Sequence, residues 1–161
     1  MMADAVVASL RSAHRYDRHF VSKLTPTVAT AIFGASDGLV ATMALILATE
    51  SHGRKVVLAA SIGLLIAEGF GMAASQYLSD AKRDLRLAII MGIATSLAII
   101  LPAVPWAFAG GGGAIVGSCV IGAVLAGVIA YLRPGGWGEW VQTYGVLISV
   151  GAIATLAGRL T

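Results

Sequence analysis

Two carboxylates lie inside apolar stretches of the sequence that are long enough to cross a bilayer. Asp37 interrupts residues 26–49, and Glu68 interrupts residues 56–79. Roughly 20 apolar residues of helix span the hydrocarbon core of a bilayer. A charged side chain at the centre of such a helix costs about 2.5–3.5 kcal/mol on insertion scales, so it is seldom present without a partner or a use. The default interpretation is a path for ions or protons through a membrane.

The residues that follow Glu68 extend its chemistry along one helix face. Met72 and Gln76 come four and eight residues later, so all three side chains share a stripe of a helix. Carboxylate oxygens suit divalent cations in general, and a thioether favours softer transition metals. Asp37 is expected at a similar depth and could complete this site from a neighbouring helix.

Two glycines flank Asp37 in the sequence. Gly34 precedes it by three residues, and Gly38 follows it directly. Small residues of this kind let a facing helix approach closely in a membrane. We therefore expect Gly34 and Gly38 to be helix-packing positions beside the site.

The composition is that of a polytopic membrane protein. Hydrophobic residues make up 58% of the 161 residues and charged residues only 12%, whereas soluble domains carry about 25% charged residues. The net charge of +3 does not indicate nucleic-acid binding, because the cations lie at predicted helix ends. The single Cys119 excludes an internal disulfide framework. No Gly-x-Ser-x-Gly, His-Glu-x-x-His or Cys-x-x-Cys motif occurs, so no enzyme is expected.

The predicted fold is all-α, with an N-terminal segment (residues 1–25) and a five-span transmembrane domain (residues 26–161). The N-terminal segment alternates apolar and basic residues, which is typical of an amphipathic helix lying on a membrane surface. A Gly110–Gly113 turn and a loop over residues 133–139 are expected to separate the later spans. The five spans are predicted at residues 26–49, 56–79, 87–109, 114–132 and 140–158.

Basic residues in the short loops predict the orientation. If the N-terminus is cytoplasmic, eight cations lie inside and three outside, and this asymmetry sets topology. Trp106, Trp137 and Trp140 fall at predicted span ends, as residues of an interfacial aromatic belt do. The inside cations are Arg11, Arg15, Arg18, Lys23, Lys82, Arg83, Arg86 and Arg133, and the outside ones are Arg54, Lys55 and Arg159.

The segments that hold these residues resemble one known family. Residues 32–40 (IFGASDGLV) are similar to the first-span signature of the vacuolar iron transporters, close to V-F-G-x-x-D-G-L-V. Residues 67–79 (AEGFGMAASQYLS) resemble the second-span pattern of that family, roughly A-G-A-x-S-M-A-x-G-E-Y-x-S. Residues 101–106 (LPAVPW) and the Gly-containing last span also fit the family.

The resemblance implies a homodimer of five-span subunits with the path between them. Such a protein moves divalent iron, and often manganese, out of the cytosol in exchange for protons. Metal ions, protons and the bilayer would be its partners, with the metal as substrate and no resident cofactor. By position, Asp37 and Met72 match family residues that line the path. The membrane would be the cell membrane of a bacterium or the vacuolar membrane of a eukaryote.

The chain departs from the family pattern in four places. Gln76 stands where the family has Glu, Glu68 stands where it has a small residue, and Leu64 stands where it has a further acid. This pattern suggests that an acid has moved along the helix. Plant and fungal members also carry a long acidic cytosolic domain after the second span, whereas here that link is only residues 80–86. The chain resembles a minimal member whose membrane site is loaded directly from the cytosol.

Two other functions fit the same residues. The chain could transport another cation or small solute on this scaffold, or it could be a non-transporting membrane subunit whose two acids hold a dimer together. Metal-dependent flux, flux of another selectivity and no flux separate the three hypotheses.

Overall fold

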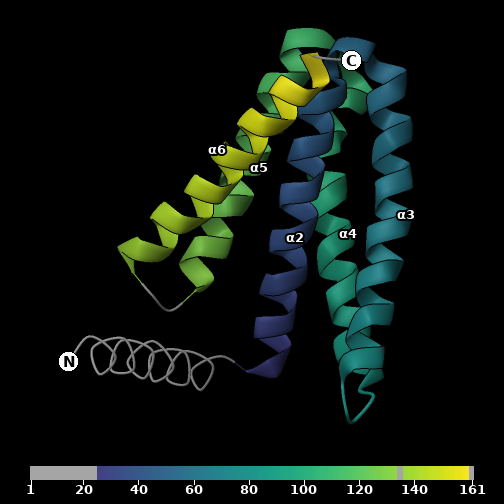
Figure 1. Cartoon of the computed structure of the whole chain (residues 1–161), viewed down its shortest axis with the longest axis vertical. Coiled ribbons are helices and arrows are strands. Elements are labelled where there is room, and N and C mark those ends of the chain that lie inside the picture. The colour runs from purple at the N-terminus through teal and green to yellow at the C-terminus, as the bar shows by residue number, and fades with distance from the viewer. Residues whose placement is uncertain (1–24, 134–135, 160–161) are drawn as a thin grey trace, which may run out of the picture.

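The computed structural model describes residues 25–133 and 136–159, and five long helices account for nearly all of them (Figure 1). All five are long and apolar enough to cross a membrane, which confirms the predicted five-span, all-α architecture. The predicted amphipathic segment at residues 1–25 lies almost wholly outside the described residues. The helices are α2 (Pro26–Thr49), α3 (Arg54–Ser79), α4 (Leu85–Phe108), α5 (Gly111–Leu132) and α6 (Trp137–Arg159), with a short 3-10 helix η1 (Glu50–His52) between α2 and α3.

Two predicted connections are shorter than the sequence suggested. The glycine run is not a complete turn, because α5 already begins at Gly111, which has a positive φ of 62°. The loop predicted over residues 133–139 is also too long, since α6 begins at Trp137.

Proline residues do not end α4. Pro102 and Pro105 both lie inside it, and each removes one backbone hydrogen bond from a helix interior. The hydroxyl of Ser118 on α5 donates to the carbonyl of Pro102 at 2.7 Å and accepts from the indole N–H of Trp106 at 3.1 Å. Trp106 is fully buried, so its predicted place in an interfacial belt is wrong: the indole joins α4 to α5.

Helix α4 supports both α2 and α3, and lies between them in Figure 1. Small residues make these contacts possible. A Cβ added to Gly38 of α2 would lie 2.5 Å from the backbone oxygen of Thr95, and one added to Gly69 of α3 would lie 2.5 Å from Oγ of Ser96. The two helices that carry the predicted site are therefore held by one common neighbour.

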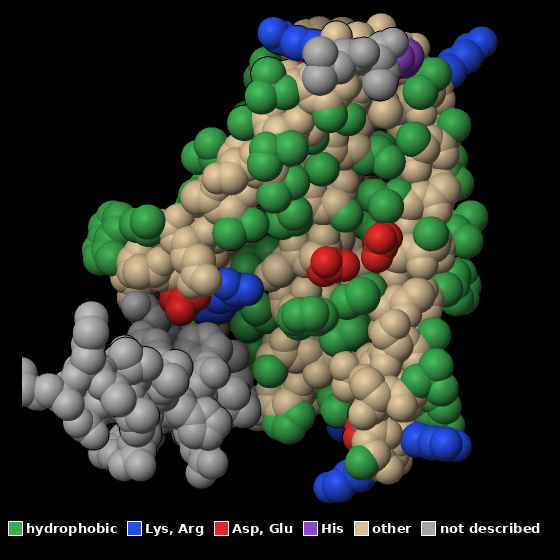
Figure 2. Space-filling view, viewed as in Figure 1, with side chains coloured by type: hydrophobic (Ala, Val, Ile, Leu, Met, Phe, Trp, Pro, Cys, Tyr) green, Lys and Arg blue, Asp and Glu red, His purple; other side chains and the backbone are tan. Residues whose placement is uncertain are grey.

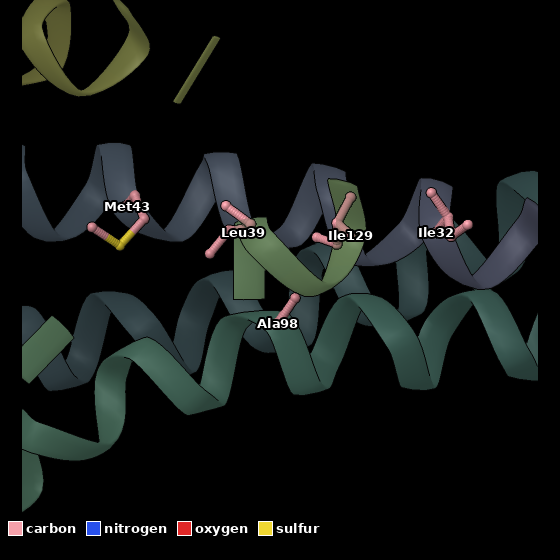
Figure 3. Close-up of a cluster of buried hydrophobic side chains, with 6 residues drawn as sticks. Ile32, Leu39, Met43, Ala98 and Ile129 are labelled. Carbon is pink, nitrogen blue, oxygen red and sulfur yellow. The ribbon is translucent and has the colours of Figure 1, made fainter. Parts of the chain in front are cut away.

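The hairpin of α5 and α6 leans away from α2 and α4 toward the end where α2 begins (Figure 1). At the opposite end it is held by buried residues of four helices, which are Ile46, Val57, Trp106 and Ala114. A second buried cluster joins α2, α4 and α5 nearer the middle and is drawn in Figure 3. Its members are Ile32, Leu39, Met43, Ala98, Ala126 and Ile129.

Candidate metal-transport site

Asp37 lies at the middle of α2 and is exposed on the surface of this single chain. The glycines on either side of it, Gly34 and Gly38, are buried against α4. The hydroxyl of the preceding Ser36 donates to the carbonyl of Ile32 at 2.7 Å and therefore does not donate to the carboxylate of Asp37. The α2–α4 contact thus fixes the helix rotation that leaves Asp37 on the outer surface.

The polar stripe of α3 lies beside the contact between α3 and α4. Glu68, Met72 and Gln76 are all half-buried, and Gly69, next to Glu68, is buried against α4. A carboxylate, a thioether and an amide therefore follow one edge of α3, in the order that the sequence predicted.

Each of the two helices that carry the predicted site has one interior acid. Asp37 and Glu68 are the acids inside α2 and α3, and Figure 2 shows acidic side chains at mid-height on the face that these helices form. Elsewhere on this face most of the coloured side chains are hydrophobic, and most Lys and Arg side chains lie toward the two ends (Figure 2). Carboxylates at this depth have no water to solvate them unless a cavity or another protein surface covers the face.

A single chain does not assemble a complete metal centre in its described part. Within residues 25–133 and 136–159, no three side chains of His, Cys, Asp or Glu lie close enough to hold a metal ion together. The ligands that one chain could offer from this face are two carboxylates, one thioether and one amide. The set is one of oxygen donors with a single soft atom.

The short link between α3 and α4 uses its acids internally. Asp80 accepts from the backbone N–H groups of Lys82 at 2.9 Å and Asp84 at 3.2 Å, and Asp84 caps α4 by accepting from the N–H of Arg86 at 2.9 Å. Arg83 takes a positive φ of 49° in this turn. Both carboxylates are thus engaged in shaping the turn, which is consistent with a link that does not collect metal.

Sequence reasoning missed the residues of α4 and the end of α5 that contact the two helices of the predicted site. Thr95 and Ser96 of α4 lie against the glycines of α2 and α3, but nothing in an apolar span marks which small hydroxyl faces which glycine. Arg133 was counted only as a loop cation, yet its guanidinium donates to Oγ of Ser36 at 3.3 Å. Its position at the predicted end of a span was a usable signal, because long basic side chains near helix ends reach along the helix.

The comparison with protein families identifies the same region. The model of the VIT family matches residues 28–85, which include most of α2, all of α3 and the link to α4. No curated protein and no solved structure matches the chain. The matched residues contain Asp37, Glu68, Met72 and Gln76. The match lies in the first two membrane-type helices, so this part of the chain is similar to the VIT family, which suggests in general a membrane transporter of metal ions.

Proposed function

We propose that this protein moves divalent iron, and also manganese, out of the cytosol in exchange for protons. One observation carries the proposal: Asp37 and Glu68 each lie near the middle of an apolar, membrane-type helix, α2 and α3. Interior carboxylates are costly in a bilayer, and acids at this depth mark ion pathways and proton relays.

The four side chains have distinct roles in this proposal. Asp37 and Glu68 supply the charge that offsets the lost hydration of a divalent ion. Met72 supplies a soft ligand that favours iron over magnesium or calcium, which take oxygen ligands. Gln76 supplies a neutral oxygen one turn further along α3. The metal is the substrate and passes through; it is not a resident cofactor.

A second copy of the chain is the proposed cover for the acidic face. Asp37 is exposed on one chain, and lipid is a poor environment for it. A two-fold axis beside α2 and α3 would bring two sets of Asp37, Glu68 and Met72 around one cavity, since an isologous interface pairs the same surface of both subunits. This arrangement also supplies the ligands that one chain lacks.

Proton exchange follows from the charges of the proposed site. Carboxylates close together in a medium of low dielectric constant repel one another strongly unless a cation or protons neutralise them. Metal and protons therefore compete for the same groups, and the arrival of one displaces the other. With the N-terminus in the cytosol, the short link between α3 and α4 also faces the cytosol, and metal loads the membrane site directly.

Purified protein in liposomes tests the proposal. A metal-sensing dye inside the vesicles is expected to respond to external Fe²⁺ and Mn²⁺, and the rate is expected to change when a pH gradient is imposed. Asp37→Asn should abolish the response. Glu50→Gln, which alters an acid in η1 at the helix end, is the matched control and should keep it.

Each other outcome assigns a different function. Metal flux that ignores the pH gradient would show transport without proton coupling. Flux of another solute alone would support a different selectivity on the same scaffold. Absence of any flux, with a dimer that needs Asp37 for assembly, would show that the acids are structural.

A further inference from the structure

A cavity of about 220 Å³ lies between α2, α5 and α6, away from the stripe of Glu68, Met72 and Gln76. Its polar lining consists of Ser36 on α2, Arg133 at the end of α5, and Gln142 and Thr143 on α6. Ser36 directly precedes Asp37 in the sequence. This cavity therefore reaches the helix turn that carries the proposed metal ligand.

Two donor groups in this cavity are not fully hydrogen-bonded by the described residues. The hydroxyl of Thr143 is buried and has no hydrogen-bond partner among the described residues. One guanidinium nitrogen of Arg133 donates to Ser36 at 3.3 Å, while the other lies 3.6 Å from Oε2 of Glu139, which is beyond hydrogen-bond distance. A water molecule occupies about 30 Å³ in the liquid and needs two to four polar partners, so this cavity has room and partners for several waters.

The charge of the cavity comes from Arg133. Its guanidinium lines the cavity, whereas Glu139 pairs with it and is not a lining residue. The lining offers hydroxyls, an amide and a cation, but no free carboxylate for a divalent ion. A fixed cation in a narrow pore is one of the means by which membrane proteins exclude other cations.

We propose that this cavity is filled with water and that Arg133 excludes divalent cations from it. Arg133 is then a specificity-determining residue: metal reaches Asp37 only from the face of α2 and α3, although water approaches the same turn of α2 from the other side. The statement about metal access rests on the proposed function, whereas the hydration and the charge of the cavity do not.

Cysteine labelling in neutral phosphatidylcholine vesicles tests hydration and charge without any transport. Replacing the only cysteine, Cys119→Ser, gives a cysteine-free background. Thr143→Cys in this background is expected to react with water-soluble methanethiosulfonate reagents. The reacting species is a thiolate, which forms in a cavity filled with water and not in lipid. A sulfonate-bearing reagent should react several-fold faster than a trimethylammonium-bearing reagent of similar size. Val141→Cys, on the exposed part of the same helix, is the control and should show no preference between the two.

Two further variants assign the preference to Arg133. Arg133→Gln should remove the preference for the anionic reagent, and Glu139→Gln should increase it, because it removes the negative partner. Excess Mn²⁺ should leave the labelling of Thr143→Cys unchanged, whether or not the protein proves to transport metal. The proposal is overturned if Thr143→Cys does not react, if the cationic reagent is as fast as the anionic one in the chain with intact Arg133, or if Mn²⁺ protects the cysteine.

Discussion

At the scale of single residues, the polar stripe of α3 places the two side chains that we propose as metal ligands, one hard and one soft, a helix turn apart. Glu68 contributes charge, and Met72 contributes a polarisable sulfur that alkaline-earth ions do not use. Both side chains are half-buried beside α4, so each can contact an ion without leaving its helix. Charge and softness can therefore be altered separately.

Met72→Ala separates softness from charge. The substitution is expected to lower the apparent affinity for Fe²⁺ or Co²⁺ more than that for Mn²⁺, by about tenfold, which corresponds to ~1.4 kcal/mol. Glu68→Gln should weaken the transport of all three, because it removes charge. Competition uptake across these metals in proteoliposomes measures both effects. Equal losses for every metal in Met72→Ala would show that Met72 only packs.

Gln76→Glu restores an acid that the resemblance to the vacuolar iron transporters leads us to expect. The position is half-buried on the same stripe as Glu68 and Met72, so the new carboxylate would face the same ion. Apparent affinity for divalent metal is expected to stay the same or rise in an uptake titration. If this variant changes nothing and Glu68→Gln transports at the wild-type rate, Glu68 is a packing residue and the idea of a relocated acid is wrong.

At the scale of elements, close contact with α4 fixes how α2 and α3 present their acids. Gly38→Ala would place a methyl group 2.5 Å from the backbone oxygen of Thr95, which cannot rotate away. We expect a loss of about 1–3 kcal/mol in stability, as for other overpacked cores, measured as a lower unfolding temperature in detergent. Gly63→Ala is the matched control, because a Cβ there meets no neighbour within 4 Å. An unchanged unfolding temperature for Gly38→Ala would contradict this packing.

The link between α4 and α5 depends on one hydroxyl. Ser118→Ala leaves the buried indole N–H of Trp106 and the carbonyl of Pro102 without the partner they share. A loss of about 1–3 kcal/mol is expected, the usual cost of an unsatisfied buried group. Ser149→Ala removes only a hydroxyl that donates to Gly145 within α6 and should unfold at the wild-type temperature. Similar effects of the two substitutions would argue against a special role for Ser118.

The apolar spans could be predicted from the sequence, and their exact ends and contacts could not. Hydropathy identifies stretches near 20 residues, so all five spans were found and their limits fell within a few residues of the helices. Hydropathy does not distinguish a buried Trp106 from an interfacial one, because both lie at a span end. Hydropathy also does not tell which faces of two helices meet. The hydrogen bond from Arg133 to Ser36 therefore follows only from the packing of α5 against α2.

At the scale of the whole molecule, the five helices differ in how much of their surface other helices of the chain cover. In their most apolar segments, α2 and α4 have the largest fractions of buried residues, whereas most residues of α3 and α6 are exposed. Large apolar side chains on α6 suit lipid, but on α2 the exposed carboxylate of Asp37 lies one helix turn after the exposed ring of Phe33. The second copy proposed above would satisfy both, because it would cover the apolar surface and surround the charges with ligand groups and an ion.

Disulfide trapping would locate that second copy. In the Cys119→Ser background, Phe33→Cys is expected to cross-link two chains on mild oxidation, because Phe33 is one helix turn before Asp37 and 60% exposed on α2. Ile153→Cys, 67% exposed on α6, is the matched control and should stay uncross-linked, since a two-fold axis beside α2 and α3 places the two copies of α6 far apart. Denaturing gels of oxidised membranes measure both. Cross-linking through α6 alone, or a monomer in mild detergent, would mean that Asp37 is covered in some other way and that the path does not lie between subunits.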